Sequence, residues 1–593
     1  MKYLKNNLII ISIITVAILL RFINLASIPV GFNDDEAAFG YNAYSILKTG
    51  MDEWGRFLPF PAFESFGDWK LVVYLYLTAI SQFFFGMNEF ATRFPSALFG
   101  VFAVFATYLL TKKLFEDRSG WQLWEGSRQR GASIWNQSKI TNLHKASTGG
   151  KETTDRTRNE VIALVAAFLL AISPWHIAAS RNAFESDLLV FFITISTYFF
   201  LVGLKNKKFI TFSFLGFVIS FYVYRSAWVF LPLFISVVIY SFRQQFKIPK
   251  VYLAKNLILA FILFLPLLPT VLTFKGQSRF LQESFISGVA RAGINADINE
   301  RRGVCKEHLP NIFCTLTYNK FLTFASTYIS NYAGNLSFKT YFDKANPSGF
   351  QSFSTRSVVY LFELPFLILG IFLLIKQKNQ ALKILIPWLL FVPIGASFAG
   401  SGNYGRINLI MPSLEIIVAF GIYTFVASLK SKFFKNIFII VLTITILGSV
   451  VKLIPDMFYS EPYFTSRFQR FGYKELFNYL ASKEQEYDKI VISRKIDYGH
   501  QYMQYLYFAK VNPAYFIQNA QRHKSQDGWV ILDSIGKYDF VDSVPGIDRL
   551  PTKTLIVAGE KEIEFPKPPI YTIDDLRGDT IFEIYDVSQV KLP

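Results

Sequence analysis

Three consecutive acids, Asp34, Asp35 and Glu36, follow directly after the first apolar segment of the chain. Carboxylates are not buried in lipid without a partner, whereas at an aqueous boundary a carboxylate can accept the proton of a reacting hydroxyl. The structural alternative is that Asp34 or Asp35 caps a helix over 36–47. Capping needs one acid and not three, so capping and catalysis can coexist, and all three acids are candidate site residues.

A second polar cluster occupies the short segment 173–187. It contains His176, Arg181, Glu185 and Asp187. Arg181 and Glu185 are four residues apart and would share one face of a helix, so the simplest alternative is one salt bridge that fixes the segment. Two acidic clusters with scattered basic residues suit a site where one carboxylate accepts a proton and cations hold a phosphate.

Candidate phosphate ligands lie in other loops. Lys70 precedes an apolar stretch at 71–85, where a lysine is most often an anchor at the headgroup boundary but can equally hold a lipid phosphate. Arg225, Tyr404 and Arg406 fall in two further loops. These residues can form one site only if their loops share one side of a membrane.

The elements that must position these residues are membrane helices. Hydrophobic residues make up 52% of the 593 and charged residues 18%, which excludes a disordered chain. A run of about 20 apolar residues can cross a bilayer, and the first run has no signal-peptide cleavage site. Eleven apolar runs predict about 11 transmembrane helices, near 8–20, 94–111, 161–174, 188–204, 209–224, 227–241, 257–274, 357–375, 384–398, 408–428 and 437–454.

One further apolar segment, 71–85, bears on this count. It has only about 15 residues, which is short for a crossing. Counting it as a span would invert every later loop. We therefore predict a helix that lies in the outer membrane interface, where Tyr and Phe are common.

The positions of lysine and arginine predict the orientation of the chain. Basic residues gather in alternate loops, and with the amino terminus in the cytoplasm all of these loops are cytoplasmic. The remaining loops, and everything after 451, then lie outside the cytoplasmic (inner) membrane. The net charge of +18 is mostly a topology signal, so it indicates membrane lipids and not nucleic acid as the surroundings.

The predicted fold is a polytopic α-helical membrane protein with a small C-terminal soluble α/β domain. The membrane domain spans 1–454 and includes three long loops: outer loops at 25–93 and 275–356, and a flexible cytoplasmic insertion at 114–160 without chemistry of its own.

The C-terminal domain spans 455–593. It shows helical spacing over 473–481 and then short β-branched or aromatic runs bounded by turn residues. We predict strands at 489–493, 529–532, 554–558, 570–573 and 580–585.

The two cysteines, Cys305 and Cys314, lie in the outer loop 275–356. In an oxidising compartment they can close a small disulfide loop, since no other cysteine competes. The alternative is two unpaired thiols.

The motifs resemble those of the polytopic glycosyltransferases of the dolichyl-phosphate-mannose–protein mannosyltransferase type, in their bacterial branch, to which the lipid A aminoarabinose transferases are related. The resemblance covers roughly 8–430. It rests on Arg21-Phe22-Ile23-Asn24-Leu25, Asp35-Glu36-Ala37, Gly67-Asp68-Trp69-Lys70, Tyr74-Leu75-Tyr76-Leu77, Glu89-Phe90-Ala91-Thr92-Arg93-Phe94-Pro95-Ser96-Ala97, Ser173-Pro174-Trp175-His176, Ser180-Arg181, Phe184-Glu185, Asn319-Lys320, Asn331-Tyr332, Cys305 with Cys314, and 406–412.

This resemblance implies a GT-C fold and an inverting transfer of a sugar from a polyprenyl-phosphate donor to a hydroxyl of an acceptor protein, lipid or glycan. It makes Asp35, Glu36 and Glu185 the catalytic candidates, with Lys70 on the donor phosphate. Asp34, His176, Arg181, Asp187, Arg225, Tyr404 and Arg406 are the further substrate-binding candidates.

A divalent ion, Mg²⁺ or Mn²⁺, held by Asp35, Glu36 and Glu185 is an alternative to lysine or arginine. The sequence departs from the family in two places. Leu71-Val72 stands where relatives often have prolines, and Asp34 adds a third acid, so the identity of the base stays open.

Two other functions remain open from the sequence. A transporter or flippase of lipid-linked sugars would carry ionisable groups near the bilayer midplane, and Glu363 and Glu415 are the few acids inside apolar runs. A membrane scaffold whose C-terminal domain binds a partner would leave the acidic clusters unexplained.

Overall fold

The computed structural model describes residues 2–116, 148–246, 249–273, 280, 284–344, 352–496, 501–525 and 528–590. Most of the predicted cytoplasmic insertion, at 117–147, lies outside the described residues.

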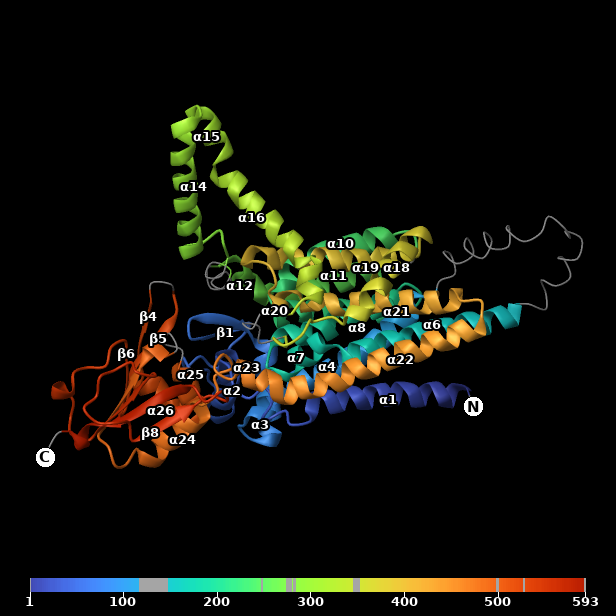
Figure 1. Ribbon diagram of the computed structural model, residues 1–593. Coiled ribbons are helices and arrows are strands. Elements are labelled where there is room, and N and C mark those ends of the chain that lie inside the picture. Colours follow the sequence, from blue (N-terminus) through green and yellow to red (C-terminus); the bar gives the residue numbers. More distant parts are fainter. Residues whose placement is uncertain are drawn as a thin grey trace, which may run out of the picture.

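Long helices run side by side and form one elongated body, with the amino terminus at one end and a sheet domain at the other (Figure 1). The helices of this body are α1 (Lys2–Phe22), α4 (Glu89–Leu114), α6 (Thr148–Ile172), α7 (Pro174–Arg181), α8 (Glu185–Gly203), α9 (Lys208–Val223), α10 (Ser226–Phe242), α11 (Lys250–Phe264), α12 (Leu268–Leu272), α18 (Leu364–Lys376), α19 (Leu382–Ala396), α20 (Tyr404–Ile407), α21 (Met411–Ser428) and α22 (Lys432–Pro455).

Six helices among the described residues are long and apolar enough to cross a membrane: Glu89–Leu114, Glu185–Gly203, Lys250–Leu272, Leu382–Ala399, Tyr404–Ser428 and Lys432–Thr465. A seventh crossing is formed if Thr157–Ile172 and Pro174–Arg181, which meet at 55°, make one span. Shorter apolar helices occur at Asn7–Phe22, Val72–Phe85, Lys208–Val223 and Ser226–Phe242. The chain is thus a multi-pass helical membrane protein, and the number eleven stays a prediction.

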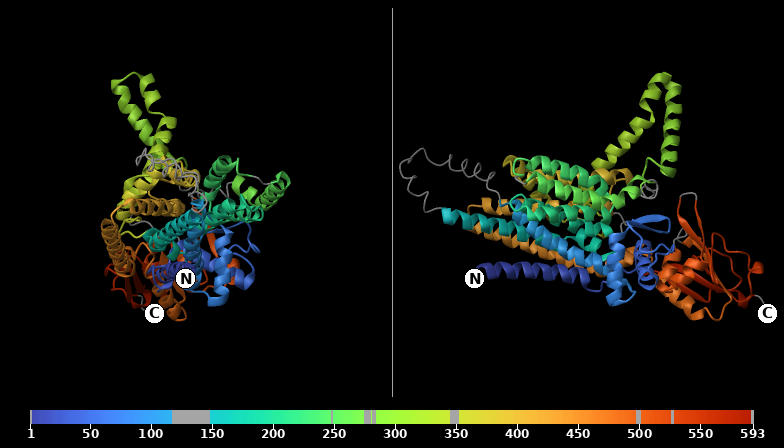
Figure 2. Two further views of the ribbon diagram at one scale, coloured as in Figure 1. Left: turned by 90° about the vertical axis from the view of Figure 1, so that its right-hand side faces the viewer. Right: turned by 180° about the vertical axis from the view of Figure 1, so that it is seen from behind.

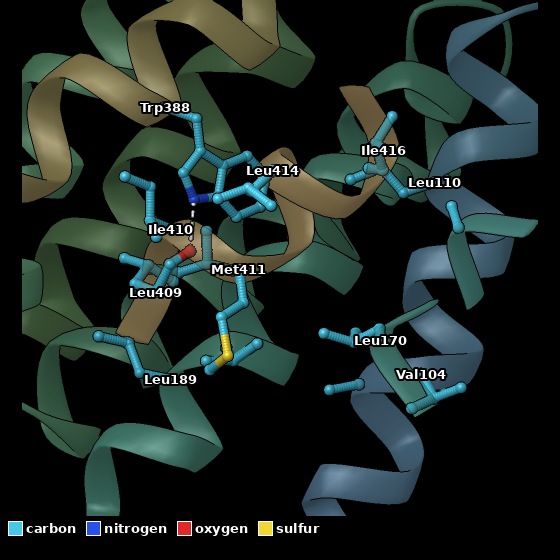
Figure 3. Close-up of a cluster of buried hydrophobic side chains, with 14 of the residues drawn as sticks. Val104, Leu110, Leu170, Leu189, Trp388, Leu409, Ile410, Met411, Leu414 and Ile416 are labelled. Atoms are coloured by element: carbon cyan, nitrogen blue, oxygen red, sulfur yellow. Dashed lines mark hydrogen bonds between the residues drawn. The ribbon is translucent and has the colours of Figure 1, made fainter. Parts of the chain in front are cut away.

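The interior of the helical body is packed with large aliphatic and aromatic side chains (Figure 3). Trp388 of α19 is fully buried, and its indole Nε1–H donates to the carbonyl oxygen of Leu409 at 2.9 Å. A buried indole N–H needs such a partner, so this bond fixes α19 against the segment that precedes α21.

The segment between α1 and α4 forms a small layer at the end of the body. It consists of α2 (Asp34–Thr49), a two-stranded antiparallel sheet of β1 (Ala62–Ser65) and β2 (Asp68–Leu71), and α3 (Val72–Phe85). The helix expected over 71–85 is therefore α3. Three phenylalanines at its end, Phe83, Phe84 and Phe85, are exposed, and the location of this helix in the membrane interface stays a prediction.

A helical hairpin projects sideways from the same end of the body (Figure 2). It contains α14 (Gly288–His308), α15 (Asn311–Thr317) and α16 (Lys320–Asn335), followed by the short α17 (Phe338–Phe342). A disulfide bond joins Cys305 to Cys314 near the tip.

The C-terminal domain contains one mixed sheet of seven strands in the order β4-β5-β6-β3-β7-β9-β8. Strand β3 is parallel to β6 and β7, and the other pairs are antiparallel. Its elements are α24 (Tyr473–Lys483), β3 (Lys489–Ser493), α25 (Gln501–Phe508), α26 (Pro513–Asn519), β4 (Gln521–Lys524), β5 (Val530–Ile535), β6 (Tyr538–Val541), β7 (Thr554–Ala558), β8 (Tyr571–Asp574) and β9 (Thr580–Asp586). The short α23 (Glu461–Thr465) ends the long helix Lys432–Thr465 that precedes the domain.

The sheet domain shares a hydrophobic core with α2. Ala37, Ala38 and Tyr41 of α2 are buried against Tyr502 and Phe516 of the C-terminal domain. The backbone also joins the two parts, since the N–H of Val530 donates to the carbonyl of Phe66 at 3.1 Å. The position of the acids on α2 is thus set from both sides, by the helical body and by the sheet domain.

Candidate active site

The first turn of α2 carries all three acids of the 34–36 cluster. Asn33 caps this helix: its side chain accepts from the N–H of Glu36 at 3.0 Å, and Glu36 accepts from the N–H of Asn33 at 3.2 Å. Since Asn33 provides the cap, neither Asp34 nor Asp35 is needed for it. Acids in a first turn also interact favourably with the helix dipole, so the cluster is compatible with the helix.

Glu36 is fully buried in a two-bond ion pair with Arg93 of α4. The Arg93 Nε and Nη2 donate to its two oxygens at 2.8 and 2.9 Å, and the N–H of Ala183 donates at 2.9 Å. Arg93 also donates to the carbonyls of Leu25, Pro29 and Gly31. Glu36 therefore holds together the segment before α2, α4 and the residues just before α8, which is a positioning role.

Asp35 pairs with Lys70, which stands on β2 opposite Phe63 of β1. The Lys70 side chain is 1% exposed, and its ammonium also donates to Asp68 at 2.8 Å. The rings of Phe66 and Phe39 lie 4.8 and 5.6 Å from this ammonium. Lys70 is thus not a loosely held snorkelling anchor; it is fixed by two carboxylates and two aromatic faces.

Arg225 reaches the same place from the loop between α9 and α10. Its Nη1 lies 3.5 Å from Asp68, and its Nη2 donates to the carbonyl of Trp69. Asp68 accordingly orients two cations, Lys70 and Arg225, that are far apart in the sequence.

A cavity of about 330 Å³ opens beside these cations. Lys70, Arg225 and Arg406 line it together with Glu185, and apolar atoms from Phe280 and Phe398 complete the wall. Four predicted site residues from four distant segments therefore border one space. A cluster of three cations suits an anionic oxygen group such as a phosphate, and the apolar wall suits a hydrocarbon tail.

His176, Arg181 and Asp187 lie away from this cavity lining and are buried in the helical body. His176 Nδ1 is 2.6 Å from Arg21 Nη2, and its Nε2 is 3.7 Å from Asp187 Oδ1. Arg21 also donates to the carbonyl of Ala171 at 3.0 Å. These contacts join α1, α6, α7 and α8, so this group fixes helices and is not part of the cavity lining.

Arg181 and Tyr404 also have structural partners. Arg181 donates to the carbonyls of Leu20, Ile23 and Ile28 at 2.8–3.0 Å, where it secures the end of α1. The Tyr404 hydroxyl donates to the carbonyl of Thr340 at 3.1 Å. The candidate pair Arg181 and Glu185 does not appear among the ion pairs of the described residues.

The side chains of Asp35, Glu36 and Glu185 do not fit a divalent metal. Both oxygens of Glu36 are already held by Arg93, and the described residues contain no group of three His, Cys, Asp or Glu side chains that could hold a metal ion.

Several residues of the site were not assigned a role from the sequence. Arg21 and Arg93 lie within or beside apolar runs, where a buried charge must be paired. Their position in the sequence could therefore have predicted that each has a buried polar partner. Asp68 belongs to the motif Gly67-Asp68-Trp69-Lys70, in which only Lys70 was assigned a role. Arg470, which contacts Asp34, gave no signal because its segment is 436 residues away in the chain.

Comparison with known proteins gives matches only at the level of structure. No family model matches the chain, and no curated protein matches it in sequence. The structure is similar to the oligosaccharyltransferase AglB of Archaeoglobus fulgidus, in complex with an inhibitory peptide and a dolichol-phosphate, with a TM-score of 0.46 and 11% identity. That match covers 85% of this chain and 64% of the archaeal one, so the chain spans less than two thirds of that relative.

A second neighbour is ArnT of Cupriavidus metallidurans. The apo form matches with a TM-score of 0.41, 13% identity, and coverage of 86% of this chain and 75% of that one. The form bound to undecaprenyl phosphate matches with the same TM-score and identity and 77% of its chain covered. The first neighbour is named as an oligosaccharyltransferase, and the second holds undecaprenyl phosphate in one of its structures. Proteins at this level of similarity can differ in activity.

Proposed function

We propose that this protein is an inverting glycosyltransferase. It moves a sugar from a polyprenyl-phosphate donor to an acceptor hydroxyl at the outer face of the cytoplasmic membrane, with its amino terminus in the cytoplasm and its C-terminal domain outside. The observation that carries the proposal is the contact of Lys70 with Asp35 at the edge of a cavity lined by Arg225 and Arg406.

The cavity supplies a place for the donor. Lys70, Arg225 and Arg406 would bind the phosphate oxygens, and Arg225 is oriented for this by Asp68. Positive groups aimed at the phosphate stabilise the charge that it gains when the sugar leaves. The apolar wall with Phe280 and Phe398 would contact the first isoprene units of the carrier.

Asp35 is the proposed general base. It takes the proton of the acceptor hydroxyl while the hydroxyl oxygen forms a bond to the anomeric carbon and the bond from that carbon to the phosphate oxygen breaks. The bonding electrons leave with the carrier phosphate, which needs no proton to depart. A single in-line displacement of this kind inverts the anomeric configuration.

The other two acids of the cluster are less suited to this role. Glu36 is buried and held by Arg93, so a substrate hydroxyl would have to displace a two-bond ion pair. Asp34 contacts Arg470 and Gln504 of the C-terminal part of the chain. Asp35 is the acid that contacts a residue of the cation-lined cavity.

The test is sugar transfer by purified protein in lipid nanodiscs. A panel of undecaprenyl-phosphate-linked radiolabelled pentoses and hexoses is offered with an extract of membrane lipids, glycans and proteins as acceptors. Replacing Asp35 by Asn should lower transfer about 10²–10⁴-fold, the usual contribution of a general base, and leave the binding of undecaprenyl phosphate intact. Asp34→Asn, at the neighbouring acid, should retain transfer. Full transfer by Asp35→Asn would sink the proposal.

A second candidate, a transporter of lipid-linked sugars, has one observation in its favour. Glu363 and Glu415, from distant parts of the chain, are fully buried in the helical body and hydrogen bond to each other. Buried acids in membrane proteins often serve ion or proton pathways. Movement of a labelled lipid-linked sugar across a proteoliposome bilayer, without any transfer product and with dependence on Glu415, would favour this candidate.

A further inference from the structure

The hairpin formed by α14, α15 and α16 exposes large apolar side chains at its tip. Ile312, Phe313 and Leu316 of the seven-residue helix α15 are 74%, 53% and 66% exposed, and Phe321 at the start of α16 is 78% exposed. We call 309–322 the apolar tip. A contiguous exposed apolar group of this kind marks a surface that meets either another protein or a membrane.

The tip has a fixed shape. The disulfide between Cys305 and Cys314 ties α15 to the end of α14. The Arg302 guanidinium also donates to the carbonyl of Tyr318 through Nε and Nη2, at 3.0 and 2.5 Å. Cys314 is buried and its neighbours Phe313 and Leu316 are not, so the cross-link turns the apolar side chains of α15 outward.

The root of the hairpin is fixed to the flank of the helical body. Tyr328 and Tyr332 of α16 donate to the carbonyls of Ile394 and Leu390 of α19, at 3.1 and 2.9 Å. The Leu390 side chain is 41% exposed, as expected for a helix face that meets lipid. Tyrosines at such a place are typical of the membrane–water interface. The hairpin thus continues outward from the lipid-facing side of the body.

The direction of the hairpin decides what the tip meets. Both views of Figure 2 show it extending sideways beyond the flank of the helical body, at the end that carries the C-terminal sheet. Chain in that position lies over the surface of the surrounding bilayer. The charges agree, because Lys306 and Lys320 are exposed on either side of the apolar residues of the tip. Lysines that flank an apolar patch can reach lipid phosphates while the patch enters the acyl boundary.

We propose that the apolar tip inserts into the headgroup and acyl boundary of the bilayer leaflet on the side of the C-terminal domain, as a second, monotopic membrane contact. This contact would hold the hairpin over the bilayer. Its root carries an aromatic group, Phe285, Phe324, Tyr328 and Phe398, and Phe398 also lines the cation-bordered cavity. The anchor therefore fixes one wall of the cavity relative to the lipid surface, whichever reaction takes place there.

The test uses the full-length protein in nanodiscs of phosphatidylcholine and phosphatidylglycerol that contain a diazirine-labelled phosphatidylcholine. After illumination, mass spectrometry should find lipid adducts on 309–322. It should find none around Tyr515, which is exposed in the C-terminal domain and serves as the internal control. The triple variant Ile312→Ser/Phe313→Ser/Leu316→Ser should lower the adducts on the tip at least about tenfold, because three large apolar side chains are lost.

Two checks keep the result interpretable. The disulfide must remain intact in the triple variant, and adducts on the membrane helix Lys432–Thr465 must be unchanged, so that a loss on the tip is local. A wild-type tip without adducts, beside a normally labelled membrane helix, would overturn the proposal. Crosslinks between the tips of two copies, formed at Lys306 or Lys320 by an added bifunctional lysine reagent and found in place of lipid adducts, would overturn it as well and assign the tip to a dimer contact. Neither outcome depends on glycosyltransferase activity.

Discussion

Asp34 and Asp35 are neighbours in the chain, but their carboxylates contact different parts of the molecule. Asp34 lies 3.0 Å from Arg470, in the segment that leads into the C-terminal domain, and 3.2 Å from Gln504 of α25. Asp35 pairs with Lys70 at the cation-lined cavity. One helical turn thus connects the docking of the sheet domain to the position of the proposed base. A displacement of that domain would therefore shift the carboxylate of Asp35 relative to the cavity.

Lys70 is expected to have two separable roles. Replacing it by Gln leaves Asp35 and Asp68 close together without the cation, and removing one partner of a buried ion pair typically lowers stability by about 3–5 kcal/mol. Undecaprenyl phosphate affinity should fall as well. The double variant Lys70→Gln/Asp68→Asn should recover stability but not affinity, as measured by thermal unfolding and by quantitative native mass spectrometry. Retained affinity in Lys70→Gln would remove Lys70 from the phosphate site.

Glu36 is expected to stabilise the fold through its ion pair with Arg93 and not to serve as the base. Glu36→Gln leaves the guanidinium of Arg93 buried without a counter-charge, and we expect a loss of stability of about 3–5 kcal/mol. Glu36→Gln/Arg93→Met removes both charges and should be more stable than Glu36→Gln alone. Thermal unfolding in detergent measures both. If Glu36→Gln were as stable as the wild type but inactive, Glu36 would have to be considered as the base.

The joint between α2 and the sheet domain depends on Gly40. A Cβ at this position would lie 2.3 Å from the Tyr507 ring, which is buried in the shared core. Gly40→Ala should therefore destabilise the joint by about 1–3 kcal/mol, the usual effect of overpacking. Limited proteolysis should then release the C-terminal domain sooner than from the wild type. The matched change is Gly448→Ala in α22, which has open space at that position and should behave like the wild type.

Glu53 is expected to make the same joint pH-dependent. Burial raises the pKa of this carboxyl, although nearby Arg522 and hydrogen bonds from Asn42 and Ser65 act in the opposite direction. Because the pKa in the folded state lies above the pKa in the unfolded state, the carboxyl favours the folded state most below the ordinary glutamate pKa. That stability is lost as the pH rises through the raised pKa, and the loss is about 1.4 kcal/mol for every pH unit that separates the two pKa values.

Replacing Glu53 by Gln removes this titration. Relative to the wild type, the variant should therefore gain stability as the pH rises from the ordinary glutamate pKa through the raised pKa of Glu53. Protease resistance of the C-terminal domain across that range measures the trend. A stability difference between the two proteins that stays constant with pH would contradict it.

Parts of the C-terminal domain could be predicted almost to the residue. The runs 489–493 and 554–558 are strands β3 and β7 with those bounds, and the helix expected over 473–481 is α24. These elements are central strands or a strongly amphipathic helix, so the order of apolar and polar residues along them predicts which side chains are buried. Strand β4, with the sequence Gln521-Arg522-His523-Lys524, was missed because it is a polar edge strand that forms only by pairing with β5.

The sequence by itself determined that the chain is a multi-pass helical membrane protein with a C-terminal sheet domain, because apolar length and strand-like runs are local properties. It also identified Asp35, Lys70, Glu185, Arg225 and Arg406 as chemically suitable residues. Only the tertiary structure separated these from Glu36, His176, Arg181 and Asp187, which look equally suitable in sequence. The reason is that a buried charge takes its role from its partners, and partners such as Arg93 for Glu36 or Arg21 for His176 are brought close only by helix packing.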